Sequence, residues 1–324
     1  MTDACGRTID YMRISVTDRC NLRCAYCMPK EGVEGIAHSE IMRYEEIMRV
    51  VNAGVSLGIT KIRITGGEPL VRKGIISFVR MVAQAPGIER VALTTNGVLF
   101  FDMGTALKEA GLDAVNFSLD CTDADTFHRL TRVDAWDKVM QGIELALELG
   151  LMTKINCVPI KAYNEADWAR LAGLAKDKPL DVRFIEMMPI GMGRDFPTVN
   201  NADVLTKLIG EYGEPTRSDE PHGSGPAEYF DFPGFMGSVG FISALSKAFC
   251  GSCNRVRLTA DGVLKPCLCY DDGLPLKPLL RSGISDQMLE AAMADAIYGK
   301  PMRHSFCGDS VEISEQKKMV QIGG

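Results

Sequence analysis

Short runs of β-branched and other apolar residues recur through the first two-thirds of the chain, and amphipathic stretches separate them. The runs predict strands at residues 12–16, 61–65, 91–94, 114–119, 153–158 and 181–187. Apolar residues at helical spacing predict helices at residues 40–57 and 136–149. Asn201 is a candidate N-cap for a further helix that ends at Glu211.

This alternation predicts an α/β fold with a parallel sheet and helices outside it, wound in the right-handed sense. The strand–helix units are too few for a closed eight-stranded barrel, and the sequence lacks the glycine fingerprint of a dinucleotide fold. We therefore expect a partial (β/α)6 TIM-type barrel with an open side. Ligands of such a barrel lie over the carboxyl ends of its strands.

The pattern changes after about residue 213. A segment rich in proline, glycine, serine and charge follows, and then short β-like runs surround several cysteines. We place a boundary near residue 220, between a partial barrel at residues 1–220 and a cluster-binding C-terminal region at residues 221–324.

Composition narrows the class of protein. A hydrophobic content of 46% with 24% charged residues is ordinary for a globular enzyme, and a net charge of −6 argues against a nucleic-acid or anionic-membrane binder. No apolar run reaches the roughly 18 residues of a membrane span, and the amino-terminal residues do not resemble a signal peptide. Eleven cysteines grouped at metal-ligand spacings then predict a cytoplasmic protein with free thiols.

Three cysteines near the amino terminus, Cys20, Cys24 and Cys27, have C-x3-C-x2-C spacing, and we call them the first cysteine group. Three thiolates are one short of a closed tetrahedral site, so a 4Fe-4S cubane held by them keeps one iron open to a small ligand. The alternative is that all three lie on one face of a buried helix. Pro29 and the polar residues between the cysteines make a poor helix interior, which favours the metal site.

The run around these cysteines, including the aromatic Tyr26, resembles the signature of the radical S-adenosylmethionine (SAM) superfamily. A second match, Gly66-Gly67-Glu68-Pro69, follows the strand predicted at residues 61–65. The resemblance implies that the open iron chelates SAM and that an electron from the cluster releases a deoxyadenosyl radical, which takes hydrogen from a substrate. It also implies a (β/α)6 core and a SAM pocket lined by Tyr26, Gly67, Ser118 and Met188.

Cys250, Cys253 and Cys267 have C-x2-C-x13-C spacing, and we call them the second cysteine group. A C-x2-C pair with distal cysteines also suits structural zinc, and Cys269 could complete a closed four-thiolate site. Spacing alone does not separate zinc from an iron–sulfur cluster. It favours Cys267 over Cys269 as the third ligand.

The two groups, with Arg255 and Arg257 beside the second, are similar to the GTP 3′,8-cyclase family, also called molybdenum cofactor biosynthesis protein A. Further matching segments lie at residues 12–20, 61–63, 94–97, 116–120, 183–189 and 323–324. The resemblance implies two 4Fe-4S clusters and SAM as cofactors, with the second cluster facing the guanine of GTP. It also implies that the terminal Gly323-Gly324 projects into the active site, whereas Cys269 departs from the family's usual pattern.

Basic residues on or beside the predicted strands suit a substrate that carries about four negative charges. Two of them, Arg255 and Arg257, face the same side of an extended segment because they are two residues apart. The resemblance implies catalytic roles for Arg13, Arg255 and Arg257. It implies GTP contacts from Arg13, Arg63, Thr94, Lys154, Arg183, Arg255, Val256 and Arg257.

The matches imply a radical SAM lyase that converts GTP to (8S)-3′,8-cyclo-7,8-dihydro-GTP in the first step of molybdenum cofactor biosynthesis. They also imply a flavodoxin- or ferredoxin-like electron donor and a downstream cyclic pyranopterin monophosphate synthase. We expect no nucleic-acid or membrane partner, and the sequence leaves open whether the chain forms a homodimer. One alternative is a radical SAM peptide-modifying enzyme with an auxiliary cluster, which leaves the Arg-x-Arg pair unexplained. Another is a zinc-stabilised adaptor without catalysis.

Overall fold

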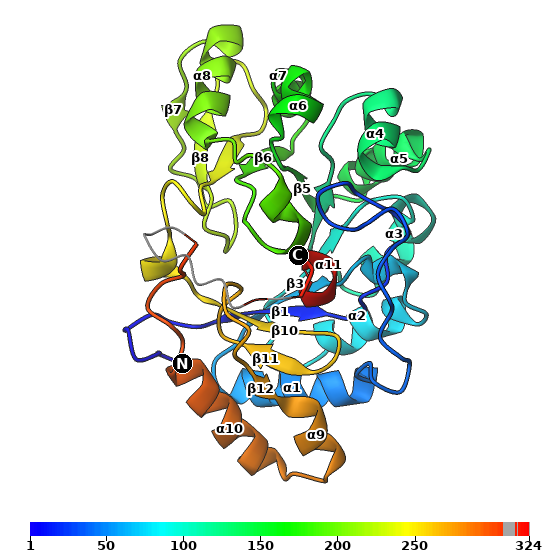
Figure 1. Ribbon diagram of the computed structural model, residues 1–324, viewed down its shortest axis with the longest axis vertical. Helices are drawn as coiled ribbons and strands as arrows, with labels where there is room; N and C mark the ends of the chain where they lie inside the picture. Colours follow the sequence, from blue (N-terminus) through cyan, green and yellow to red (C-terminus); the bar gives the residue numbers. More distant parts are fainter. Residues whose placement is uncertain (307–314, 316, 324) are drawn as a thin grey trace.

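The computed structural model describes residues 1–306, 315 and 317–323. In this part of the chain, one open sheet contains the strands in the order β12-β11-β10-β1-β2-β3-β4-β5-β6-β9-β8-β7 (Figure 1). The strands are β1 (Tyr11–Ser15), β2 (Lys61–Thr65), β3 (Arg90–Thr95), β4 (Ala114–Ser118), β5 (Met152–Cys157), β6 (Asp181–Ile185), β7 (Thr216–Arg217), β8 (Glu228–Asp231), β9 (Val239–Ile242), β10 (Arg255–Leu258), β11 (Val263–Lys265) and β12 (Leu274–Pro275).

Neighbouring strands from β1 to β6 are parallel, and each corresponds to one predicted strand. β10 adds to β1 and β9 adds to β6, both in parallel, while β7, β8, β11 and β12 form antiparallel pairs at the two margins. The sheet does not close. The prediction of a partial barrel with an open side is therefore confirmed, whereas the domain boundary near residue 220 stays a prediction.

Helices occupy the connections between strands, as the alternating pattern predicts. They are α1 (Tyr44–Ser56), α2 (Ile75–Ala83), α3 (Phe100–Glu109), α4 (Ala124–Thr131), α5 (Trp136–Glu148), α6 (Lys161–Asn164), α7 (Trp168–Asp177), α8 (Asn201–Tyr212), α9 (Leu276–Arg281), α10 (Asp286–Tyr298) and α11 (Met319–Ile322). Four short 3-10 helices are η1 (Pro69–Val71), η2 (Glu165–Asp167), η3 (Gly191–Asp195) and η4 (Cys250–Ser252).

The predicted helix starts need two corrections. The first helix begins at Tyr44 rather than residue 40, because Arg43 is its N-cap and the Glu46 carboxylate accepts the Arg43 backbone N–H at 2.7 Å. The N-cap of α8 is Asn200 rather than Asn201, because the Asn200 side chain accepts the Ala202 N–H at 2.9 Å. Asn201 is instead buried, and its amide donates to Ser243 at 3.0 Å.

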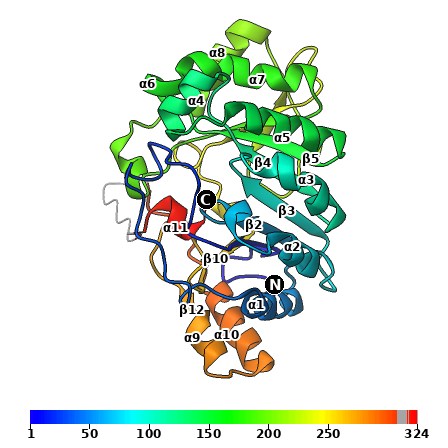
Figure 2. The same ribbon diagram turned by 90° about the vertical axis from the view of Figure 1, so that its right-hand side faces the viewer.

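One continuous core lies between the sheet and its outer helices. In β4, Val115 and Phe117 are fully buried, and the Phe117 ring contacts Phe100 of α3 edge-on at 5.1 Å between ring centroids. Figure 2 shows the outer helices on one side of the curved sheet and α11 on the other, within the curve. The concave side therefore remains available to ligands.

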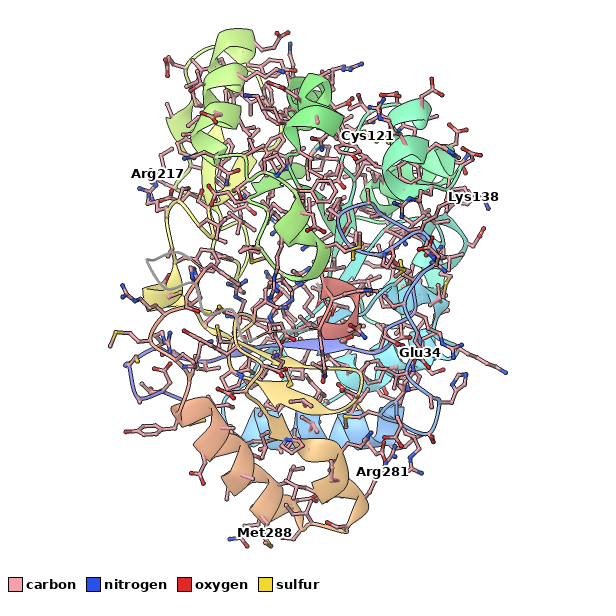
Figure 3. All side chains as sticks on the ribbon, viewed as in Figure 1. Glu34, Cys121, Lys138, Arg217, Arg281 and Met288 are labelled. Carbon is pink, nitrogen blue, oxygen red and sulfur yellow. The ribbon has the colours of Figure 1, made fainter. Side chains whose placement is uncertain are left out.

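The C-terminal helices α9 and α10 pack beside α1 at the lower end of the molecule. Arg281, at the end of α9, donates to Glu46 of α1 at 2.9 Å (Figure 3), and Arg49 of α1 pairs with Asp286 of α10 at 2.7 Å. These contacts fasten the C-terminal region to the first helix of the barrel. Within the described residues, no helix has the length and apolar content needed to cross a membrane.

Candidate functional site

The first cysteine group lies on the loop that follows β1. The Leu22 N–H donates to the Cys20 sulfur at 3.4 Å, and the Asn96 amide, at the end of β3, lies 3.7 Å from that sulfur. Asn96 also donates to Asn21 at 2.8 Å. The segment is a loop with one turn and no helix, so the alternative of a shared helical face is wrong. Its backbone is held over the carboxyl ends of the strands.

Apolar surroundings keep these thiols in the neutral form. Burial raises the pKa of Cys20, and burial followed by the neighbouring Cys27 raises the pKa of Cys24 well above its usual value. Burial also raises the pKa of Cys27 to about 12. A cationic iron site would reverse this balance, because metal binding displaces the thiol protons. Thiols with raised pKa values are weak nucleophiles, so these pKa values do not indicate a catalytic cysteine.

The glycine pair after β2 lets this loop approach closely. A Cβ on Gly67 would lie 2.5 Å from the Arg19 carbonyl oxygen and 2.8 Å from that of Asp18. The Gly67 N–H donates to Thr17 at 2.6 Å, and the Glu68 N–H donates to Arg19 at 2.8 Å. Only glycine permits this backbone contact, which fixes the cysteine loop against the end of β2.

Glu68 holds the next strand in place through its buried carboxylate. Its oxygens accept the Thr95 hydroxyl at 2.8 Å and the backbone N–H groups of Asn96 and Leu70 at 2.7 and 3.0 Å. Burial nonetheless raises the pKa of Glu68 to about 7. Glu68 thus connects the end of β2 to Asn96, the residue whose amide lies against Cys20.

The residues expected to line a SAM pocket lie around one cavity of about 370 Å³. Tyr26 donates its hydroxyl to Asp120, just beyond β4, at 2.6 Å. Burial raises the pKa of Asp120 to about 6 and, with Asp120 as the second cause, raises that of Tyr26 well above its usual value. The expected lining residues are Tyr26, Gly67, Ser118 and Met188.

The second cysteine group reaches the same cavity from the other side. Cys250 begins η4, Cys253 follows it directly, and Cys267 follows β11. Burial opposes ionisation of Cys253, but Arg255 and Lys300 outweigh it and lower the pKa of this thiol to about 7. A thiol with a lowered pKa is a ready metal ligand. The cavity therefore has cysteines at both ends.

The surroundings of the two candidate third ligands differ. The fully buried Cys269 packs with Leu268 and Phe306, and its sulfur lies 3.5 Å from the Ser305 hydroxyl. Cys267 is partly exposed and lies near Arg257 and Lys300, whose positive charges would stabilise a thiolate there. Both residues line the cavity, so the choice of Cys267 as the third ligand, made on spacing, stays a prediction.

Over residues 1–306, 315 and 317–323, no three His, Cys, Asp or Glu side chains converge on one point as ligands of a single metal ion. A cubane makes no such demand, because each of its cysteines binds a different iron. The donor set of each group is three cysteines beside a cavity, on one loop in the first group and on two segments in the second, and it fits an iron–sulfur cluster with one open position.

A row of three arginines crosses the floor of the cavity. Arg13 of β1 is in register with Arg63 of β2 on one side and with Arg257 of β10 on the other. The three side chains line the cavity at one level of the sheet. Burial and then Arg257 lower the pKa of Arg13 well below its usual value, and burial and then Arg255 lower that of Arg257 to about 10. Several positive charges buried close together repel one another, so this part of the cavity favours an anionic ligand.

The other expected GTP contacts extend from this row toward β6. Arg63 approaches the Thr94 hydroxyl at 3.5 Å, and Arg183 donates to Asn156 at 2.8 Å. Lys154 forms an ion pair with Asp181 and donates to Tyr229 at 3.1 Å. The described cations that line the cavity are Arg13, Arg63, Lys154, Arg183, Arg255 and Arg257, together with Lys61, Arg90 and Lys300.

The side chain of Val256 is not placed to contact a ligand in the cavity. It lies between Arg255 and Arg257 on β10, so its side chain points to the opposite face and is fully buried in the core. Val256 does not line the cavity, unlike its two neighbours. A contact from this residue to a ligand would have to come from its backbone.

Among the cavity residues that the sequence analysis did not predict, two lie at the second cysteine group. Lys300 donates its ammonium to the Arg255 carbonyl at 2.9 Å, and the His304 N–H donates to the Cys250 sulfur at 3.4 Å. The His304 Nε2 atom is buried without a partner in the described structure. Both residues lie beyond α10, more than thirty positions after Cys267, so no local spacing connects them with the cysteines.

Two family profiles cover most of the chain. The Radical SAM superfamily profile matches residues 14–175, and the Molybdenum Cofactor Synthesis C profile matches residues 180–306. The chain is 44% identical to the GTP 3′,8-cyclase of Clostridium perfringens (strain 13 / Type A) over 325 residues. It is 46% identical to the GTP 3′,8-cyclase of Desulforamulus reducens over 328 residues, and both comparisons cover all of each chain. The chain belongs to the GTP 3′,8-cyclase family.

The fold of this GTP 3′,8-cyclase family member also resembles that of a solved structure. Streptococcus suis SuiB bound to S-adenosylmethionine superposes with a TM-score of 0.64 at 14% sequence identity. The match covers 90% of this chain and 67% of SuiB. At this identity the likeness shows the fold alone, and it agrees with the open, mostly parallel sheet.

Proposed function

We propose that this chain is a radical SAM GTP 3′,8-cyclase, which forms the bond between C3′ and C8 of GTP in the first step of molybdenum cofactor biosynthesis. The observation that carries the proposal is a single cavity with three cysteines at each end and a row of arginines on its floor. The full-length identity to curated GTP 3′,8-cyclases supports the same activity.

At one end, the first cysteine group would hold a 4Fe-4S cluster, with SAM beside Tyr26 and Gly67. When bound, the reduced cluster and SAM would supply the radical that removes hydrogen from the ribose. The chain's own part is to orient: Gly67 admits the cysteine loop, and Asp120 fixes the Tyr26 hydroxyl at 2.6 Å. Burial of the thiols also limits access of water to this end.

At the other end, the second cysteine group would hold a second 4Fe-4S cluster that faces the guanine, with Cys267 as the third ligand. Arg13, Arg63 and Arg257 would then bind the triphosphate, and their mutual repulsion in the free protein would be relieved by its negative charge. Lys154 would have to exchange its Asp181 partner for a phosphate oxygen, or share its donors between them. Arg255, beside Cys253, would act next to the base.

The same proposal includes a flavodoxin- or ferredoxin-like reductant and a downstream synthase that forms cyclic pyranopterin monophosphate. The expected setting is cytoplasmic, with free thiols. Gly323 is described and buried, while Gly324, the other half of the expected terminal pair, lies outside the described residues. We propose that these last residues belong to the active site.

Anaerobic incubation of the reconstituted protein with GTP, SAM and dithionite tests the activity. We expect liquid chromatography with mass analysis to separate from GTP an isomer of the same mass, 3′,8-cyclo-7,8-dihydro-GTP, and to detect 5′-deoxyadenosine. The masses are equal because the hydrogen removed from C3′ is replaced by the electron and proton taken up at N7 on reduction. About eight irons per chain and no stoichiometric zinc would support two clusters. If 5′-deoxyadenosine forms at an equal rate without GTP and the nucleotide is unchanged, a different substrate, such as a peptide, replaces GTP.

A further inference from the structure

The C-terminal segment, residues 315 and 317–323, lies between the two ends of the cavity. Figures 1 and 2 both show α11 inside the curve of the sheet, next to the loop that follows β6. Ile322 packs with Ile190 of that loop and with Leu268 and Phe306 of the second cysteine region. The segment therefore touches elements from both ends of the cavity.

The last described residue fits a slot that admits no side chain. Gly323 has φ +89, and a Cβ there would lie 2.6 Å from Ser15 Cβ and 2.8 Å from Thr65 Oγ1, at the ends of β1 and β2. Its carbonyl accepts a hydrogen bond from Arg257 at 3.0 Å. A slip of one residue would bring Ile322 to this slot, so the segment must be held in one register.

Apolar contacts alone do not set such a register. α11 has only four residues, too few to be stable by itself, and its buried Val320 and Ile322 are similar in size and chemistry. Apolar burial is non-directional, so a shifted segment could bury comparable side chains. Something directional must select the observed position.

A buried ion pair supplies that direction. Lys265, at the end of β11, pairs with Glu315, and the two residues are 1% and 0% exposed. The other Glu315 oxygen accepts the Lys317 N–H at 2.7 Å, and the Glu315 carbonyl accepts from Arg194 of η3 at 2.8 Å. The Lys265 ammonium has a second, more distant carboxylate in Asp271, at 3.9 Å.

Burying two charges costs desolvation that their attraction roughly offsets, so such a pair adds little net stability. Its best-attested use is to specify register, because any other position leaves a charge buried without its partner. We propose that Lys265 and Glu315 are positioning residues that fix the register of the C-terminal segment and so place Gly323 beside Arg257. The functional half of this proposal rests on the proposed cyclase activity.

The test uses the anaerobically reconstituted full chain and two readouts. The first is tryptic cleavage after Lys317 and Lys318, measured by mass analysis of the released terminal peptide, which reports release of the segment whatever the activity is. The second is the ratio of cyclised nucleotide to 5′-deoxyadenosine, which a general loss of folded protein leaves unchanged. The variants are Lys265→Met, Glu315→Gln and the double variant Lys265→Met/Glu315→Met. Lys277→Met, which removes the partner of the exposed Glu40, is the matched control.

We expect Lys265→Met to raise the tryptic cleavage rate at least about tenfold, because it leaves a buried carboxylate uncompensated and populates the released state. Its product ratio should fall by a similar factor, with Glu315→Gln intermediate and Lys277→Met unchanged. The double variant should regain protection from trypsin, because no buried charge remains, but not the product ratio.

Three results would overturn the proposal. If Lys265→Met resists trypsin as well as the wild-type protein does, the ion pair does not hold the C-terminal segment. If a variant releases the segment but keeps the wild-type ratio of cyclised nucleotide to 5′-deoxyadenosine, the segment has no role in the reaction. If the double variant keeps the wild-type ratio of cyclised nucleotide to 5′-deoxyadenosine, apolar packing sets the register instead. If wild-type protein forms no cyclised nucleotide, the proposed function fails, yet the tryptic readout still decides whether the pair holds the segment.

Discussion

Replacing Gly67 by alanine tests whether close backbone contact at the end of β2 positions the cysteine loop. The added Cβ would meet the Arg19 carbonyl oxygen at 2.5 Å, the Arg19 carbonyl carbon at 2.7 Å and the Asp18 oxygen at 2.8 Å. These are backbone atoms, which cannot rotate away as a side chain could. The loop that leads directly into Cys20 must therefore move.

The size of the movement follows from the distances. Ordinary contact with a Cβ begins near 3.4 Å, so the loop must retreat by about 0.9 Å. The hydrogen bonds from Gly67 N–H to Thr17 and from Glu68 N–H to Arg19 are now 2.6 and 2.8 Å long. That shift would stretch them to about 3.5 and 3.7 Å, at and beyond the limit of hydrogen bonding. Losing both costs about 1–3 kcal/mol. A displacement of about 1 Å next to the reacting groups lowers the rate by roughly 100-fold.

The assay measures iron content, SAM affinity and the rate of 5′-deoxyadenosine formation in anaerobically reconstituted protein. We expect Gly67→Ala to retain the second cluster but to form 5′-deoxyadenosine about 100-fold more slowly. The control is Gly210→Ala in α8, where an added Cβ has no atom within 4 Å. A Gly67→Ala protein with wild-type SAM affinity and rate would refute the argument that this contact positions the loop.

Three further predictions concern the cysteines and the cations. Alanine at any residue of the first cysteine group should abolish 5′-deoxyadenosine formation and reduce the iron content from about eight to about four per chain. Wild-type SAM cleavage in one such variant would contradict the assignment of these cysteines as cluster ligands. Cys267→Ala should lose GTP turnover, while Cys269→Ala should lose less of it. Product formation and the GTP-dependent magnetic resonance spectrum of the second cluster measure both variants, and the reverse order would make Cys269 the third ligand. Arg63→Ala and Lys154→Ala should each weaken GTP binding by about 1.5–3 kcal/mol, roughly 10–150-fold in Kd, without changing guanosine binding. Calorimetry measures both affinities, with Lys138→Ala at an exposed lysine as the control. If the ratio of GTP affinity to guanosine affinity is unchanged in a variant, the substituted residue does not bind the phosphates.

Local patterns predicted the barrel well because its strands have local signals. The strand predicted at residues 61–65 has the same bounds as β2. The other five predicted strands correspond to β1 and β3–β6, and their bounds differ from the observed ones by at most two residues at either end. The helix predicted from residue 136 begins there as α5, and α8 begins one residue early, but α1 begins four residues late because its start depends on capping hydrogen bonds between Arg43 and Glu46. Periodicity does not report such bonds.

Contacts between distant segments could not be predicted in this way. Nothing in the sequence near Lys154 indicates its pairing with Asp181, and nothing near Lys265 indicates Glu315, fifty positions later. His304 lies beside Cys250 only because α10 returns the chain to the second cysteine region. The motifs identified the cysteines and arginines, while the tertiary fold alone determined which charges neutralise one another.

The pairing of β10 with β1 has a consequence for synthesis of the chain. β1 leaves the ribosome well before β10, so one of its two edges acquires its partner only when residues 255–258 have been made. Until then a nascent barrel would present a row of unpaired N–H and C=O groups beside the first cysteine group, the kind of edge that templates aggregation. Closing a loop of that length also slows folding. Chaperone protection of the unfinished chain, and cluster insertion only after its release, would follow from the order of these strands.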